Sequence, residues 1–322
     1  MQFLSSIPLV VTSALVIFSP LQEGGTTHVA QMIIRFLILA WAGGALALSI
    51  RQGRLTIPLL SVRYFVLVFL GFAVIATMFS PYAHPSRQWL FTIICYATLF
   101  YLLVSFVDRW EHVHTLTIVV VLMGVGEAAL TILQGLVWND MRPSGTFFNP
   151  NFLAGYLAVS WAILLSAAVY GYRRTAALHW LPISPTLWWF GVGASLGSLF
   201  LAVLLTQSRG GMIVVLVATV FIVMARHGWK VAGSCLVLLM VGGLLIPTPL
   251  RERVQAEHQQ NPVSYARLQM WQGALTQMAE HPLGIGLGLY QYTYPRYAFP
   301  VEGEIARYGK VAQTPHNDYL QM

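Results

Sequence analysis

The sequence is poor in charge. Only 9% of its 322 residues are Asp, Glu, Lys or Arg, whereas 57% are hydrophobic. Soluble domains carry about 25% charged residues, so this deficit excludes an ordinary soluble protein. Apolar runs of about 20 residues are typical of membrane-spanning helices, and the sequence therefore predicts an all-α polytopic membrane protein. The net charge of +7 is small for this length and does not indicate nucleic-acid binding.

Cysteine and compact metal-binding motifs are also scarce. Cys95 and Cys235 are the two cysteines, and both lie inside apolar runs, so no disulfide framework is predicted. Residues of metal-ligand type occur late in the chain without a compact spacing such as HExxH: His281, Glu302, Glu304, His316 and Asp318. We therefore expect no metal and no other cofactor.

The apolar residues form nine candidate spans. These cover residues 3–20, 29–50, 59–79, 88–107, 114–136, 151–170, 187–206, 210–226 and 229–246. We predict a transmembrane bundle over residues 1–246 and a large, partly helical loop over 247–315. Residues 316–322 resemble the start of a further helix, and we expect the chain to be truncated there.

Basic residues are unevenly divided between the loops, and this division predicts the topology. Most of them lie in or beside the even-numbered loops: Arg51, Arg54, Arg63, Arg109, Arg173, Arg174, Arg226 and Lys230. Positive charge in short loops favours the cytoplasmic side. The N-terminus is therefore expected in the cytoplasm, and the long loop after the ninth span is expected outside, in the periplasm if the cell has two membranes.

Two short outward loops combine polar residues with helix-breaking ones. In the loop over 142–152, Asn149-Pro150 indicates a turn and Asn151 can cap the sixth helix, whose N-terminus then favours an anion. The alternative is a plain connecting turn. In Thr206-Gln-Ser-Arg-Gly-Gly211, the two glycines let a ligand approach the backbone closely, which suits a phosphate beside Arg209. The alternative is that Arg209 reaches lipid phosphate.

The membrane spans and the long loop contain further polar groups. Arg35 and Glu127 lie inside apolar spans, where they either pair with each other or line a polar cavity. In the long loop, residues 265–274 have helical spacing. The GxGxG of residues 284–288 does not follow a strand, so it does not indicate a dinucleotide site. His316 can exchange a proton near neutral pH, although a surface or capping histidine is the alternative.

Taken together, these elements resemble the O-antigen ligase and polymerase family of bacterial envelope glycosyltransferases. The matching pieces are Gly145-Thr-Phe147, Asn149-Pro-Asn-Phe-Leu-Ala154, Thr206-Gln-Ser-Arg-Gly-Gly211, Arg267 to Trp271, His281-Pro-Leu-Gly-Ile-Gly-Leu-Gly288 and His316-Asn-Asp-Tyr-Leu320. The resemblance runs from about Met141 to the end. Relatives usually carry more spans after the His-Asn-Asp element, and that is where this chain departs from them.

The resemblance implies a lipid-sugar-dependent glycosyltransferase in the bacterial inner membrane. The donor would be a glycan on undecaprenyl diphosphate, and the acceptor a hydroxyl of lipid A-core, another glycan or a protein. Arg209 and Arg267 would stabilise the leaving diphosphate, and His316 would lie near the reacting bond. We predict further donor-binding residues at six positions: Arg142, Asn149, Asn151, Gln207, Asn317 and Asp318.

The sequence fits more than one function. Within the family, ligase, polymerase and protein O-oligosaccharyltransferase fit the sequence equally. A transporter or flippase would concentrate polar residues near the membrane midplane in broken helices, whereas here they gather on the outward loops. A structural scaffold whose long loop binds a partner is the third alternative.

Overall fold

The computed structural model describes residues 2–51, 53, 61–107, 109–170, 184–245, 263–281 and 284–297. Within these ranges the regular elements are helices, and Glu23 and Phe147 form one isolated parallel bridge. The predicted all-α class is confirmed for this part of the chain.

A helix lies at each of the nine predicted spans. They are α1 (Gln2–Leu21), α2 (His28–Arg51), α3 (Arg63–Met78), α4 (Ala83–Phe106), α5 (Trp110–Leu136), α6 (Pro150–Tyr170), α7 (Pro185–Leu205), α8 (Arg209–His227) and α9 (Trp229–Leu245). In the described residues, six helices are long and apolar enough to cross a membrane, and three shorter apolar segments lie in α1, α3 and α9. The protein is therefore a multi-pass membrane protein.

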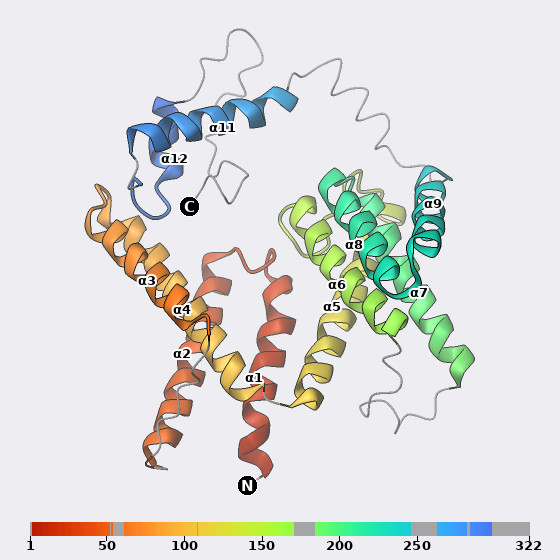
Figure 1. Ribbon diagram of the computed structural model, residues 1–322, viewed down its shortest axis with the longest axis horizontal. Helices are drawn as coiled ribbons and strands as arrows, with labels where there is room; N and C mark the ends of the chain where they lie inside the picture. Colours follow the sequence, from red (N-terminus) through yellow and green to blue (C-terminus); the bar gives the residue numbers. More distant parts are fainter. Residues whose placement is uncertain are drawn as a thin grey trace. The chain divides into compact units, whose positions relative to one another are not determined.

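The chain divides into two compact units, and the first joins Met1–Leu48 with Leu103–Leu250. In this unit α6 packs against α5, α7 and α8, while α9 packs on α8 (Figure 1). Leu153, Leu157 and Trp161 of α6 are buried in its apolar core together with side chains of α5, α7 and α8. Helix α6 is thus the centre around which the first unit is built.

Small side chains let α6 and α8 approach closely. A Cβ at Gly211 would lie 2.6 Å from the Cβ of Ala154, so the two helices touch near their first turns. Deeper in the same interface, the indole N–H of Trp161 donates to Thr219 Oγ1 at 2.9 Å. Close backbone approach and interhelical hydrogen bonds are how helices associate in lipid, where apolar burial alone gives little preference.

The second unit joins Ser49–Leu102 with Arg251–Met322. Its described part contains α3, most of α4, α11 (Val263–Glu280), the short α12 (Tyr290–Thr293) and the 3₁₀ helix η2 (Tyr294–Arg296). The helical spacing predicted over residues 265–274 is confirmed, because these residues lie in α11. The side chains of Gln277 and Thr293 hydrogen-bond to each other and so join α11 to α12.

The glycine-rich segment of this unit folds over the turn between α3 and α4. Gly284, Gly286 and Gly288 all have positive φ, at 81°, 113° and 69°. Ser86 Oγ donates to the carbonyl of Leu287 at 3.0 Å, and a Cβ at Gly288 would overlap the indole of Trp89. The GxGxG spacing therefore reflects backbone conformation and close packing.

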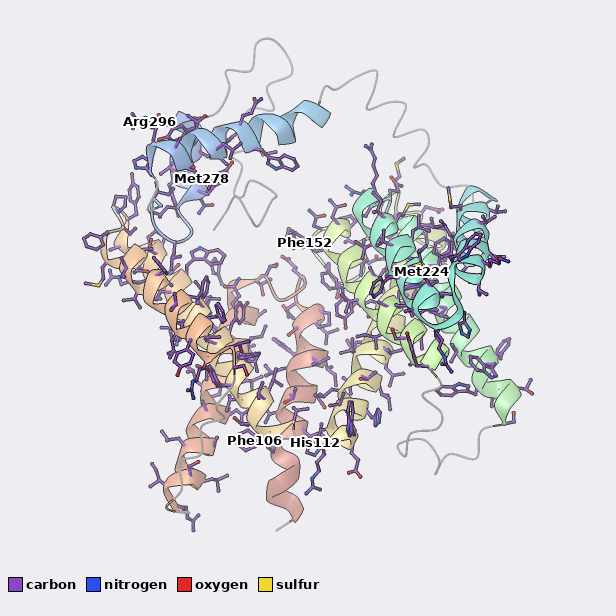
Figure 2. The ribbon with its side chains drawn as sticks, in the orientation of Figure 1. Phe106, His112, Phe152, Met224, Met278 and Arg296 are labelled. Atoms are coloured by element: carbon purple, nitrogen blue, oxygen red, sulfur yellow. The ribbon has the colours of Figure 1, made fainter. Side chains whose placement is uncertain are left out.

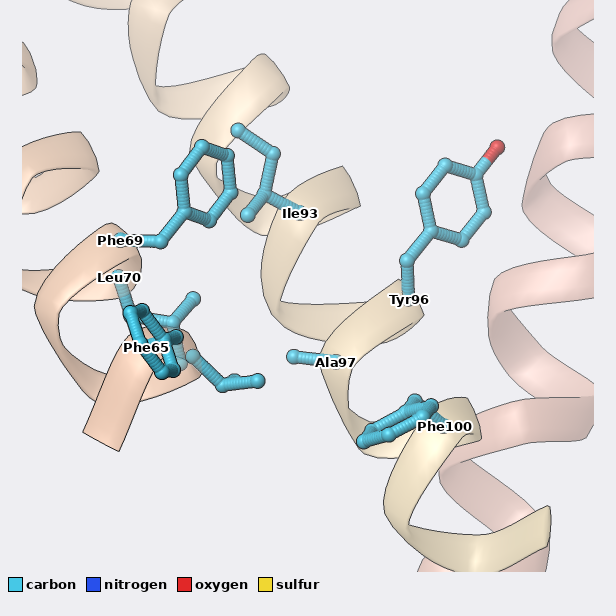
Figure 3. A pocket seen from close by; sticks show the side chains of 8 residues that line it. Phe65, Phe69, Leu70, Ile93, Tyr96, Ala97 and Phe100 are labelled. Carbon is cyan, nitrogen blue, oxygen red and sulfur yellow. The ribbon is translucent and has the colours of Figure 1, made fainter. Parts of the chain in front are cut away.

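Large apolar side chains cover the outer faces of both units, Phe152, Met224 and Met278 among them (Figure 2). Between α3 and α4 lies an apolar groove of about 480 Å³, lined among others by Phe65, Phe69 and Phe100 (Figure 3). Such faces are suited to lipid chains, as expected for membrane-spanning helices.

Candidate anion site at the start of α6 and α8

The loop before α6 and the turn before α8 are joined by side-chain hydrogen bonds. Arg142 Nε donates to the carbonyl of Thr206 at 3.1 Å, and its Nη2 donates to Asn151 Oδ1 at 2.9 Å. The amide of Gln207 donates to the carbonyl of Met141 at 2.6 Å. Two of the predicted motifs, separated by about sixty residues, are therefore parts of one structure.

The N-terminus of α6 differs in one detail from the prediction. Asn149, rather than Asn151, is the cap: its Oδ1 accepts from the backbone N–H of Asn151 at 2.9 Å. Pro150 is the first helical residue, where its missing N–H loses no intrahelical bond. The expectation that Asn151 caps this helix was therefore wrong. Asn151 is the second helical residue and accepts a hydrogen bond from Arg142 instead.

The N-terminus of α8 is formed by a tight turn whose side chains are buried. Ser208 is the cap, and its hydroxyl accepts from the N–H of Gly211 at 3.3 Å. Gln207 has a positive φ of 55° and is 7% exposed, so its side chain is held against the neighbouring loop. Arg209, the first helical residue, is exposed, and a Cβ at the exposed Gly210 would meet nothing within 4 Å.

This arrangement makes one end of the first unit electropositive. Helices α6 and α8 pack against each other and begin at the same end, so their positive dipole ends lie together. Arg142 and Arg209 add two cations, while the carboxylate of Asp140, which accepts from the N–H of Arg142 at 3.1 Å, offsets part of this charge. Adjoining helix N-termini with guanidinium groups are suited to bind a phosphate or diphosphate.

The loop before α6 contacts a buried carboxylate of α5. Glu127 of α5 is 3% exposed. Its Oε2 accepts from the N–H of Thr146 at 3.0 Å, and its Oε1 lies 2.6 Å from the Thr146 hydroxyl oxygen. The sequence identified Glu127 as an intramembrane charge but did not predict Thr146 as its partner. Arg35, the other intramembrane charge, donates to Gln31 at 3.0 Å.

The structure brings together five of the nine predicted site residues: Arg142, Asn149, Asn151, Gln207 and Arg209. Arg267 lies in α11 of the second unit. His316, Asn317 and Asp318 lie outside the described residues. In the described part of the chain, no three residues of metal-ligand type lie together, and most of the late candidates are outside it.

Comparison with known proteins gives a family match for the C-terminal part of the chain. Residues 194–322 match the family model described as O-Antigen ligase. No curated protein and no solved structure matches the chain. The match includes Gln207, Arg209, Arg267 and the His316-Asn-Asp318 element, whereas Arg142, Asn149 and Asn151 precede it. The resemblance predicted from the motifs is confirmed over residues 194–322, which match the O-antigen ligase family.

Proposed function

We propose that the protein transfers a glycan from undecaprenyl diphosphate to a hydroxyl acceptor. The observation that carries this proposal is the joined pair of helix N-termini at α6 and α8, with Arg209 exposed beside them in the region that matches the O-antigen ligase family. The reaction takes place at the periplasmic face of a bacterial inner membrane, with the N-terminus of the chain in the cytoplasm. The division of basic residues between the loops supports this orientation.

The donor diphosphate is the group that needs stabilisation. Cleavage of the bond between the sugar and the phosphate leaves the bonding electrons on the diphosphate, whose negative charge grows in the transition state. Guanidinium groups bind phosphate oxygens bidentately, and we assign this role to Arg209 and Arg267. The first turns of α6 and α8 supply fixed partial positive charge, so the leaving group is neutralised by the protein itself.

The acceptor hydroxyl is a poor nucleophile and needs a base. We assign this role to His316, whose neutral imidazole takes the hydroxyl proton as the new glycosidic bond forms. A positioned base of this kind contributes about 10²–10⁴-fold to the rate. Asn317 and Asp318 are assigned to binding beside it. In this proposal transfer needs no metal, so activity in the presence of EDTA is expected to equal that without it.

A test in cells separates the proposed roles from structural ones. Arg209→Ala, Arg267→Ala and His316→Ala are each expected to abolish glycan transfer in a strain that lacks the native gene, while the amount of membrane-inserted protein stays unchanged. Arg226→Ala is a matched control, because Arg226 lies in the last turn of α8, at the opposite end of the helix from Arg209. Normal transfer by all three variants would refute the assignment.

The acceptor is identified by the glycans of the deletion strain. Long chains left on undecaprenyl diphosphate identify a ligase, single repeat units identify a polymerase, and loss of protein-bound glycan identifies a protein O-oligosaccharyltransferase. We favour the ligase. A transporter or flippase would move a lipid-linked glycan across proteoliposomes without forming a glycosidic bond, and that result would replace the present proposal.

A further inference from the structure

We infer that Glu127 and the turn between α1 and α2 hold the donor-binding loop in place, with Thr146 as the residue that connects them. This inference rests on the proposed function. Thr146 lies between Arg142 and Asn149, and its hydroxyl oxygen is 2.6 Å from Glu127 Oε1 and 2.7 Å from the carbonyl of Pro20. Its backbone N–H donates to Glu127 Oε2 at 3.0 Å. One residue of the loop thus joins α5 to the end of α1.

Gly145, the residue before Thr146, is also held by hydrogen bonds. Gly145 and Gln134 exchange two hydrogen bonds: the amide N–H of Gln134 donates to the Gly145 carbonyl at 2.9 Å, and the Gly145 N–H donates to Gln134 Oε1 at 2.8 Å. Gly145 has φ of +59°, and a Cβ there would overlap Glu127 Oε2. Only glycine therefore allows the loop to rest on the carboxylate.

The turn between α1 and α2 contacts the loop from the other side. Glu23 forms the isolated bridge with Phe147, and a Cβ at Gly24 would lie 2.5 Å from Phe147 Cδ1. The Gly24 N–H donates at 3.1 Å to the Pro20 carbonyl, which also lies beside the hydroxyl of Thr146. The first two helices precede the region that matches the O-antigen ligase family, yet they help to shape the candidate donor site.

The consequence for the reaction follows from the position of Thr146 in the chain. The two ends of its loop bear Arg142, which is bonded to the turn before α8, and Asn149, which caps α6. A misplacement of about 1 Å far from the reacting bond can lower a rate about 10²-fold. Thr146 and Glu127 therefore act as positioning residues, because they reach the donor only through the loop.

Conservative variants show whether Glu127 acts through the hydrogen bonds that position the loop or through its negative charge. In Glu127→Gln, the amide oxygen can accept from the Thr146 N–H, and the amide N–H₂ can donate to the Thr146 hydroxyl, which then donates to Pro20. Every hydrogen bond of the junction is retained without the charge. Thr146→Ser keeps the hydroxyl, whereas the nearly isosteric Thr146→Val removes its single donor proton, which lies between Glu127 Oε1 and the Pro20 carbonyl.

The test measures transfer kinetics of the purified full chain in lipid nanodiscs, with an undecaprenyl-diphosphate glycan and a hydroxyl acceptor. We expect Thr146→Val to raise the KM for the donor about tenfold with a smaller change in kcat, while Thr146→Ser and Glu127→Gln stay within about twofold of the wild type. A wild-type donor KM in Thr146→Val overturns the inference. A folded Glu127→Gln protein without activity also overturns it, because the charge would then be needed.

Two further variants complete the experiment. If Thr146→Val does not fold, Gly24→Ala replaces it, because this change crowds Phe147 without removing a hydrogen bond from the loop. We expect Gly24→Ala to raise the donor KM as well, and an unchanged KM overturns the inference. Arg209→Ala is measured in the same assay: if it transfers glycan like the wild type, the proposed donor site is wrong, whatever the Thr146 and Glu127 variants do.

Discussion

Arg142 Nε donates to the backbone carbonyl of Thr206 at 3.1 Å, so the loop that leads into α6 is bonded to the turn that leads into α8. The same guanidinium also donates to Asn151 Oδ1 at 2.9 Å. Arg142 was predicted to bind the donor, and its geometry adds a second role, because it holds the two helix N-termini together.

A double-mutant cycle tests the contact between Arg142 and Asn151. Arg142→Lys keeps the charge but not the planar fork that serves two acceptors at once, so we expect a loss of about 1–3 kcal/mol in the free energy of unfolding. Asn151→Ala alone should destabilise less. The two changes should be non-additive by about 0.5–3 kcal/mol, measured by chemical unfolding in detergent. Strict additivity would show that the contact contributes nothing.

Substitution by alanine is expected to affect stability differently at Gly210 and at Gly211, the two glycines in the first turn of α8. Gly211→Ala places a methyl group 2.6 Å from the Cβ of Ala154 and should destabilise the protein by about 1–3 kcal/mol through overpacking. Gly210→Ala meets open space and should leave unfolding unchanged. Its methyl group would nevertheless obstruct a diphosphate at this helix end, so we expect a raised donor KM. A wild-type KM would remove Gly210 from the site.

The packing of the glycine-rich segment of the second unit can be tested with a destabilising substitution and a second substitution that compensates for it. Gly288→Ala introduces a methyl group that overlaps the Trp89 indole, at a residue whose φ is +69°. We expect faster proteolysis of the segment near residues 284–289. Trp89→Ala in the same chain should restore part of the resistance, because it removes the overlap and leaves only the backbone strain of about 1–2 kcal/mol. Absence of any rescue would contradict the packing described.

Tyr297 gives a pH-dependent signal for the contact between α11 and η2. Its hydroxyl donates to Glu280 Oε2 at 2.7 Å, and this hydrogen bond, followed by burial and the carboxylate charge, raises the pKa of Tyr297 above the ordinary 10.0, while Arg296 acts in the opposite direction. The folded state favours the neutral phenol. The contribution of Tyr297 to the stability of the folded state is therefore complete below the pKa that Tyr297 has in the unfolded chain. It is lost as the pH rises through the higher pKa of Tyr297 in the folded protein.

The measurement for Tyr297 is an ultraviolet titration in which the spectrum of Tyr297→Phe is subtracted. Glu280→Gln is expected to lower the pKa of Tyr297 toward its ordinary value, because the carboxylate is removed. An identical Tyr297 titration in the two proteins would show that Glu280 is not its partner in solution.

The sequence predicted the helices well and the contacts of the site only in part. Apolar length is a strong local signal, and each of the nine spans coincides with a helix. The α6 cap could also have been predicted locally, since Pro150 fits the first helical position and makes Asn149 the cap. Arg142 and Thr206 are 64 positions apart, and nothing in their own neighbourhoods indicates that they meet.

The contact between Glu127 and the loop before α6 could be predicted only in part. A carboxylate inside an apolar span needs polar partners, so Glu127 was identified, and the alternatives were Arg35 or a polar cavity. Thr146 is one of many threonines, and its contact depends on how the loop returns along α5. The positive φ of Gly145 is what allows that return, and a glycine in a loop does not reveal its φ in the sequence.

The most direct test of the central claim is the donor kinetics of Arg209→Ala in purified protein. Removing a group that stabilises the leaving diphosphate should lower kcat/KM for transfer from the undecaprenyl-diphosphate glycan by about 10²–10³-fold. Arg226→Ala, at the other end of α8, should remain near the wild type. A kcat/KM for Arg209→Ala equal to that of the wild type would contradict the account.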